Sequence, residues 1–217
     1  MLPKEITLGC RIGDTRLYRV HAVSIGWMHL CKYAEYIIKN NPQYIDYSTP
    51  LFVDKDKDLH DDVVEYIRRR ELGPILSSKF VKIAYLTNKI LELRIIVNDK
   101  VYCVCGKPDM YYIACFDKAK QLVNIIVEVT LRKYVEHIIP RLRVYMIAAY
   151  MYTGLPTLGI IISNKGIYSE ALSLHAAQDL IRFFKRRIDI EEIYVETPEW
   201  ICSYCDLQPY CPKYGSR

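Results

Sequence analysis

The stretch Gly106–Thr130, GKPDMYYIACFDKAKQLVNIIVEVT, contains two apolar runs separated by a short polar turn at 117–120. Tyr, Ile and Val dominate both runs, so the stretch predicts an antiparallel β-hairpin. Asp109 precedes the first strand and Glu128 lies near the end of the second, which places both acids at one end of the hairpin. A divalent cation is a common reason to keep two repelling carboxylates together. Two unrelated, solvated acids would give the same pattern, and the hairpin alone favours that interpretation.

The composition indicates one globular domain of ordinary to large size. The chain has 217 residues, of which 51% are hydrophobic, and this is enough for a full core. It has no apolar run long enough to span a bilayer, and its first residues lack the pattern of a signal peptide, so we expect a cytoplasmic protein without membrane contact. A net charge of +5 permits a nucleic acid partner without requiring one. Eight cysteines in a cytoplasmic chain indicate metal binding rather than a disulfide framework.

The residues before the central hairpin predict a mixture of strands and helices. Residues 5–22 predict a hairpin, residues 24–39 a helix that begins at Ser24, and residues 42–56 a loop or lid. A second helix is expected over 58–70, with Leu59, Val63, Val64 and Ile67 facing inward. Strands are expected over 79–86, 89–97 and 100–105.

The residues after the hairpin predict further helices around the sheet. A long helix is expected over 134–152, with a kink or a restart at Pro140. A buried strand over 158–163 is followed by 167–169, which can pair back on it, and by an amphipathic helix over 173–188. The predicted fold class is therefore α/β or α+β, with helices flanking a mixed sheet.

Three cysteines lie close together near the C-terminus, in the pattern Cys202-x2-Cys205-x5-Cys211. Three thiolates make an incomplete tetrahedral site, so a fourth ligand must come from elsewhere in the chain. Cys31 is the best candidate, because its helix is otherwise apolar and aromatic. Spacing alone supports zinc and an iron–sulfur cluster about equally, since the second CxxC pair of the common zinc ribbons is missing. The remaining cysteines are interpreted as core thiols in strands: Cys10, Cys103, Cys105 and Cys115.

The order of these features resembles the RecB-like nucleases of the PD-(D/E)xK superfamily, and more specifically the CRISPR-associated iron–sulfur exonucleases of the spacer-acquisition machinery. The resemblance extends from about Ser24 to Pro212. It rests on Cys31, His60 at a helix start, the G-x-P-D turn at 106–109, the strand that ends in Glu128, Tyr145 in a helix, and C-x2-C-x5-C. It implies an N-terminal hairpin over 1–23, a RecB-like restriction-endonuclease-type core over 24–197, and a cluster segment over 198–217 that closes on Cys31.

The resemblance also implies a function. His60, Asp109, Glu128 and the carbonyl of Val129 would bind one or two Mg²⁺ or Mn²⁺ ions, with Tyr145 as a further catalytic residue. The cluster, [4Fe–4S] or as a variant [2Fe–2S], would have a structural role and be held by Cys31, Cys202, Cys205 and Cys211. The implied activity is that of a metal-dependent exodeoxyribonuclease acting on single-stranded DNA ends during spacer acquisition. The implied partners are DNA and the CRISPR adaptation integrase complex, and family analogy adds a ring-shaped homo-oligomer.

Two positions depart from the family pattern. Thr130 stands where the E-x-K motif has its lysine, and Arg141 stands where the Q-x3-Y motif that ends at Tyr145 has its glutamine. Arg132, Lys133 and Arg141 are candidates to supply the missing cation. These departures leave a second hypothesis open, a catalytically weakened module that binds nucleic acid or partner proteins in the adaptation complex. A third is a protein with a zinc-binding tail and no nuclease function. Apart from the resemblance, His60 would be a helix-start residue and Tyr145 a core aromatic.

Overall fold

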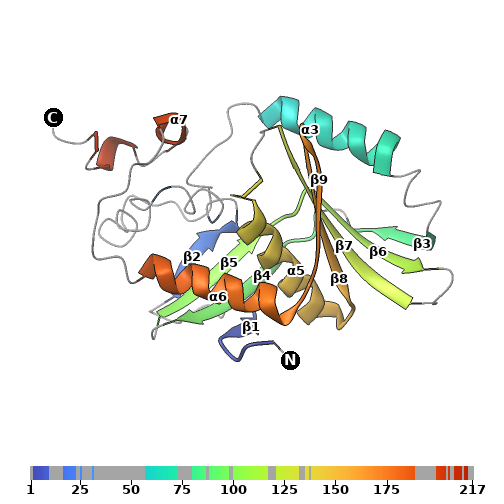
Figure 1. Cartoon of the computed structure of the whole chain (residues 1–217), viewed down its shortest axis with the longest axis horizontal. Coiled ribbons are helices and arrows are strands. Elements are labelled where there is room, and N and C mark those ends of the chain that lie inside the picture. Colours follow the sequence, from blue (N-terminus) through green and yellow to red (C-terminus); the bar gives the residue numbers. More distant parts are fainter. Residues whose placement is uncertain are drawn as a thin grey trace.

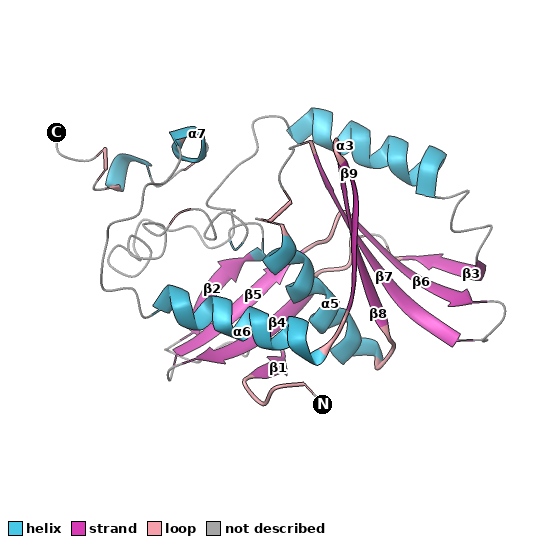
Figure 2. Cartoon of the chain, viewed as in Figure 1, coloured by secondary structure: helices cyan, strands magenta, loops and turns pink. Residues whose placement is uncertain are grey.

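The computed structural model describes the chain in part, and the described residues form two mixed β-sheets with helices around them (Figures 1 and 2). The described residues are 2–9, 17–22, 25, 31, 57–72, 80–86, 88–97, 100–116, 121–131, 135–136, 138–188, 199–203, 205, 208–211 and 213–214. The helix expected over 24–39 falls almost entirely outside these residues, and the loop expected over 42–56 falls fully outside them.

The first sheet has the strand order β1-β4-β5-β2. Its strands are β1 (Ile6–Leu8), β4 (Leu91–Val97), β5 (Lys100–Gly106) and β2 (Leu17–His21). β4 is antiparallel to β1 and to β5, whereas β2 is parallel to β5. The hairpin expected over 5–22 is therefore wrong. Its two strands form, but they lie on opposite edges of the sheet, because each pairs with a strand from much later in the chain.

The second sheet has the strand order β3-β6-β7-β8-β9. Its strands are β3 (Phe80–Tyr85), β6 (Met110–Phe116), β7 (Gln121–Thr130), β8 (Thr157–Ser163) and β9 (Gly166–Ala171). β6 and β7 form the predicted antiparallel hairpin, with Met110 opposite Val127, and β8 runs parallel to β7. The mixed α/β class is confirmed. The described strands divide between two sheets: after β2 the chain contributes β3 to the second sheet, returns to the first sheet for β4 and β5, and joins the second sheet again at Met110.

Helix α5 (Ile139–Thr153) connects the two sheets (Figure 1). It contacts β1 and β4 of the first sheet and β7 and β8 of the second, and α6 (Leu174–Ile188) packs against both α5 and β4. The helix begins at Ile139 rather than near residue 134, so Pro140 lies in its first turn, where a missing N–H costs no helical hydrogen bond. Gly154 ends it in a left-handed conformation with a φ of 70°.

Helix α3 (Lys57–Tyr66) continues as a π-helix, η2 (Ile67–Leu72), and covers a different face of the second sheet from α5 (Figure 2). Ile67 and Leu72 pack there in a separate apolar cluster with side chains of β6 and β7. Leu59 was expected to face inward but is 57% exposed, because the apolar contacts of α3 begin one turn later, at Val63. The first turn of α3 instead reaches the end of β7.

The C-terminal segment contributes short elements, α7 (Glu199–Cys202) and the 3₁₀ turn η3 (Gln208–Tyr210). No helix in the described part of the chain is long and apolar enough to cross a membrane. The domain boundaries drawn from the sequence stay predictions.

Candidate metal centre

Three separate elements bring polar groups together at the end of β7. His60 comes from the first turn of α3, Asp109 from the turn between β5 and β6, and Glu128 and Val129 from β7. The hairpin register places Asp109 directly beside Glu128, and the backbone N–H of Asp109 donates a hydrogen bond of 3.4 Å to Oε1 of Glu128. The prediction that these two acids lie at the same end of the hairpin is confirmed.

His60 lies between a carboxylate and a backbone carbonyl. Its Nε2 is 3.1 Å from the carbonyl oxygen of Val129 and 3.5 Å from Oδ2 of Asp109. The same Oδ2 accepts a hydrogen bond of 2.7 Å from the N–H of Val129, which fixes the Asp109 carboxylate against the strand. On the other side of the ring, Nδ1 lies 3.3 Å from Oδ1 of Asp61. Sequence reasoning missed Asp61, although it directly follows His60 at the helix start.

The charge of this arrangement favours a protonated histidine in the metal-free protein. The hydrogen bond to Asp109 raises the pKa of His60 to about 9, although burial of the ring acts in the opposite direction. A metal ion would bind the neutral imidazole and would therefore have to displace this proton.

The atoms around His60 suit a hard divalent cation. Mg²⁺ and Mn²⁺ favour oxygen ligands and accept imidazole, and bonds of about 2.1 Å at right angles separate neighbouring ligand atoms by about 3 Å. Oδ2 of Asp109 and the Val129 carbonyl oxygen both lie at nearly this distance from Nε2 of His60. Among the described residues, no three His, Cys, Asp or Glu side chains are grouped to hold a metal ion. A cation here would therefore need the Val129 carbonyl.

The Glu128 carboxylate is paired with an arginine. The Glu128 side chain is 1% exposed, and its Oε2 is in direct contact with Nη2 of Arg141, which projects from the first turn of α5. Burial raises the pKa of the Glu128 carboxyl, and the Arg141 guanidinium opposes that rise. Nε of Arg141 is also buried and has no hydrogen-bond partner among the described residues.

Tyr145 lies beneath the site rather than on its surface. It is fully buried, and its hydroxyl donates a hydrogen bond of 3.2 Å to the carbonyl of Lys107. A Cβ at Gly106 would come within 2.6 Å of this hydroxyl, so the glycine allows the close approach. Tyr145 therefore supports the turn that carries Asp109.

The position of the expected motif lysine holds no charge, and two of the candidate substitutes cannot be placed. Thr130 is 8% exposed at the end of β7, opposite Ser163 of β8, and adds no charge to the site. Arg132 and Lys133 lie outside the described residues.

Three of the four candidate cluster cysteines lie in one neighbourhood. Cys31, Cys202 and Cys211 are all buried. Burial raises the pKa of the Cys211 thiol, and the neighbouring Cys31 and Cys202 raise it further. Cys205 is partly buried against the same core, and its N–H donates a hydrogen bond of 3.2 Å to the carbonyl of Cys202.

The strand cysteines correct one interpretation. Cys103 is disulfide-bonded, so its interpretation as a core thiol is wrong, whereas Cys105 and Cys115 retain thiol side chains that are not part of a disulfide. Cys10 lies outside the described residues.

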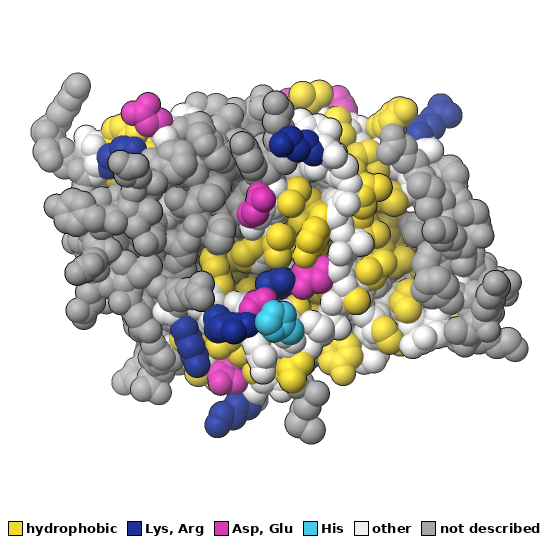
Figure 3. Space-filling view, in the orientation of Figure 1, with side chains coloured by type: hydrophobic (Ala, Val, Ile, Leu, Met, Phe, Trp, Pro, Cys, Tyr) yellow, Lys and Arg dark blue, Asp and Glu magenta, His cyan; other side chains and the backbone are white. Residues whose placement is uncertain are grey.

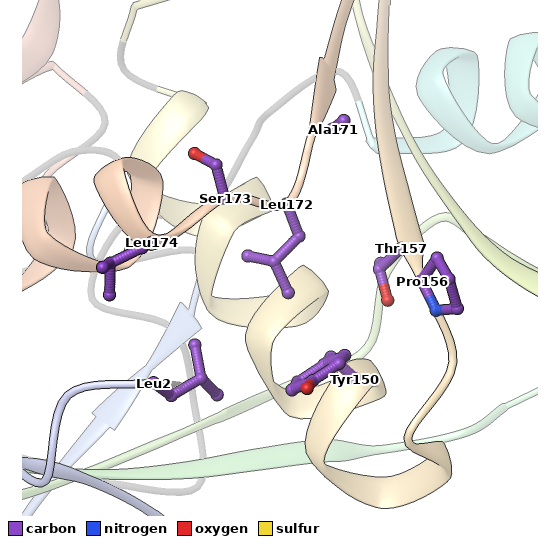
Figure 4. A pocket seen from close by; sticks show the side chains of 8 residues that line it. All are labelled: Leu2, Tyr150, Pro156, Thr157, Ala171, Leu172, Ser173 and Leu174. Carbon is purple, nitrogen blue, oxygen red and sulfur yellow. The ribbon is translucent and has the colours of Figure 1, made fainter.

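The surface offers two further features. On the face shown in Figure 3, basic and acidic side chains lie intermixed around a histidine, next to a hydrophobic area. A pocket of about 240 Å³ lies near the C-terminal end of α5, whereas Arg141 lies at the other end of that helix, so the pocket is separate from the metal centre (Figure 4). It is lined by Leu2, Tyr150, Pro156, Thr157, Ala171, Leu172, Ser173 and Leu174.

No family model and no curated protein matches the sequence. The crystal structure of a protein called SSO0001 has a TM-score of 0.49 and 14% identity, with coverage of 94% of this chain and 89% of that one. A protein from Eubacterium rectale described as "Putative exonuclease" has a TM-score of 0.31 and 12% identity, with coverage of 81% and 68%. Because both TM-scores are below 0.5, neither similarity carries an argument about activity.

Proposed function

We propose that this protein is a metal-dependent nuclease whose site is formed by His60, Asp109 and the end of β7. The observation that carries the proposal is that the Asp109 carboxylate and the Val129 carbonyl both lie within 3.5 Å of Nε2 of His60. These groups come from three distant parts of the sequence. A solvated histidine at a helix start would not need a carboxylate and a strand-end carbonyl on the same nitrogen.

Each residue of the proposed site would have a distinct role. A bound Mg²⁺ or Mn²⁺ ion would activate water and offset the charge that builds on a phosphodiester. His60, Asp109 and the Val129 carbonyl would hold the ion, and Asp61 would orient the His60 ring through Nδ1. Tyr145 would keep the 106–108 turn in place. In the reaction, the attacking water would lose a proton as its oxygen bonds to phosphorus, the bond to the leaving nucleotide oxygen would break, and that oxygen would take up a proton.

The substrate and the biological setting come from the sequence resemblance. We propose that the substrate is DNA with single-stranded ends, from which nucleotides are removed during spacer acquisition. The proposed partner is the CRISPR adaptation integrase complex. The order of His60, the G-x-P-D turn, Glu128 and the terminal cysteines supports this part of the proposal.

We also propose an iron–sulfur cluster, [4Fe–4S] or [2Fe–2S], on Cys31, Cys202, Cys205 and Cys211. The burial of Cys31, Cys202 and Cys211 and the electrostatic effect of Cys31 and Cys202 on the Cys211 thiol support it. Its role would be structural, because it would join the C-terminal segment to a residue near the start of the chain.

A second candidate function is a nucleic-acid- or partner-binding module with weakened catalysis. The contact between Arg141 and Glu128 favours it, because the acid expected to bind metal already has a cation, and Thr130 adds none. Thr130→Lys separates the two functions. A large gain in cleavage would indicate a weakened site, and an unchanged rate would mean that another residue supplies the cation.

Cleavage of linear single-stranded DNA in Mn²⁺ tests the first proposal. The parent should degrade linear DNA, and circular single-stranded DNA should resist, because an exonuclease needs an end. Asp109→Asn should lower the rate at least about a hundredfold, since the carboxylate is lost without a change in size. Asp62→Asn, an exposed acid on α3, should cleave like the parent. Equal rates for Asp109→Asn and the parent would refute the site.

A further inference from the structure

Arg141 and Arg143 lie two residues apart in α5 and use their guanidinium groups differently. Nε and Nη2 of Arg143 both contact the Glu170 carboxylate, at 2.9 to 3.2 Å, and Nη1 binds Asp179 at 3.3 Å. Arg143 thus has the two-point geometry of an arginine that holds a fold together. Arg141 contacts Glu128 through Nη2, and its buried Nε has no hydrogen-bond partner among the described residues.

This difference argues that the Arg141 contact is not optimised for stability alone. A buried donor without a partner has a cost, and such atoms in native proteins call for an explanation. A two-point contact with Glu128 would remove the cost. The contact through Nη2 leaves Nε without a partner among the described residues and places a positive guanidinium against the carboxylate that the family resemblance assigns to metal binding.

The same contact changes the ligand set. With Glu128 turned to Arg141, His60 and Asp109 are the side chains left beside the Val129 carbonyl, and the described residues contain no group of three suitable side chains. A divalent ion at His60 would also be repelled by the nearby guanidinium.

We propose that Arg141 is the residue that determines how tightly this site binds divalent metal. In the parent the Arg141 guanidinium binds the Glu128 carboxylate in place of a metal ion. The site therefore binds one ion weakly, through His60, Asp109 and the Val129 carbonyl. Loss of the guanidinium makes Glu128 available as a third side-chain ligand. This inference rests on the proposed function, because it concerns the same metal ion.

Titration of the metal-free protein with Mn²⁺, followed by electron paramagnetic resonance of the free ion, tests the proposal without any cleavage assay. Arg141→Gln should bind Mn²⁺ at least about tenfold more tightly than the parent, because a repelling charge is removed and a carboxylate is released. Arg141→Lys retains the charge and should remain within about threefold of the parent. Arg182→Gln removes an exposed positive charge from α6 and should also match the parent.

Glu128→Gln supplies an independent test through a double-mutant cycle. It should change Mn²⁺ affinity less than about threefold in the parent background and more than about tenfold in the Arg141→Gln background. Each variant is first checked for cooperative thermal unfolding, and the Glu128→Gln comparison in the parent background decides the question if Arg141→Gln does not fold. A strong loss of Mn²⁺ affinity there would mean that Glu128 already binds the ion.

The outcomes separate this inference from the proposed function. If Asp109→Asn weakens Mn²⁺ binding but Arg141→Gln binds no more tightly than the parent, the role of Arg141 is refuted and the metal site stands. If Asp109→Asn binds Mn²⁺ like the parent, the metal site is refuted and the role assigned to Arg141 falls with it.

Discussion

The Nε2 atom of His60 is the point at which α3, the β5–β6 turn and β7 meet. Its hydrogen bonds to Asp109 and to the Val129 carbonyl bind the first turn of α3 to the second sheet. The metal-free protein should therefore draw stability from a protonated His60.

The pH dependence of stability tests this contribution. The pKa of His60 is raised from 6.5 to about 9, so its stabilising effect is complete below pH 6.5 and is lost as the pH rises through about 9. In the presence of a chelator, the advantage of the parent over His60→Gln in free energy of unfolding should shrink by about 1–2 kcal/mol across this range, after an allowance for solvent screening. Chemical denaturation measures it. An advantage that stays constant with pH would contradict the assignment. His175→Gln, a change at an exposed histidine, is the control.

Sequence patterns predicted which residues belong to the candidate site more successfully than they predicted which contacts those residues make. Asp109 and Glu128 were predicted to be neighbours because hairpin register follows from two apolar runs and a short turn. The contact of Arg141 with Glu128 depends on where α5 begins relative to β7, which no local pattern encodes. Arg141 could therefore be named from the sequence as a candidate cation, but its partner could not.

At the scale of elements, the position of α5 decides where Arg141 and Tyr145 lie. The helix packs closely on β8 at Gly159, where an added Cβ would meet the Met146 sulfur and come within 2.8 Å of Leu142 Cδ2. This contact is why a residue without a side chain is needed in the middle of an apolar strand.

Replacement of this glycine tests the α5–β8 contact. Gly159→Ala should lower the free energy of unfolding by about 1–3 kcal/mol, because the fully buried Met146 and Leu142 side chains would have to move to make room for the added Cβ. Ser169→Ala on β9, at an exposed position, should have an effect within about 0.5 kcal/mol. Denaturant unfolding compares the two variants. A neutral Gly159→Ala would show that α5 sits further from the sheet than described.

Element types followed from local periodicity, and long-range pairing did not. The β6–β7 hairpin, the β8–β9 return and α6 were all predicted, because their apolar residues alternate or recur with a clear period. The N-terminal hairpin was wrong, because β1 and β2 pair with strands far later in the chain, Ile6 with Ile95 and Leu17 with Val101. Leu59 was misplaced since helical spacing does not reveal where a helix first touches a sheet.

At the scale of the whole molecule, the cysteines offer a connection between the two ends of the chain. Cys31 packs in the main core, and Cys202 and Cys211 lie near it. Spacing could identify three of these residues as a set, but the fourth ligand depends on tertiary structure. The disulfide at Cys103 was not foreseen, because a strand cysteine looks the same in sequence whether it is paired or free.

Metal analysis and absorbance of anaerobically purified protein test the cluster. The parent should contain iron and absorb broadly in the visible region, and Cys31→Ala should lose both, because three thiolates do not complete the site. Cys115→Ala, at a β6 cysteine that is not part of a disulfide, is the matched control and should retain iron. Stoichiometric zinc in a colourless parent would contradict the cluster and would remove the support for the CRISPR-associated setting.

The most direct test of the central claim is Mn²⁺ binding by the metal-free protein, parent against Asp109→Asn. The parent should bind the ion saturably, and Asp109→Asn should bind it at least about tenfold more weakly, because the Asp109 carboxylate, one of the three proposed ligands, loses its charge. Asp62→Asn should match the parent. If Asp109→Asn binds Mn²⁺ as tightly as the parent, the groups around His60 do not form a metal centre, and the nuclease proposal is wrong.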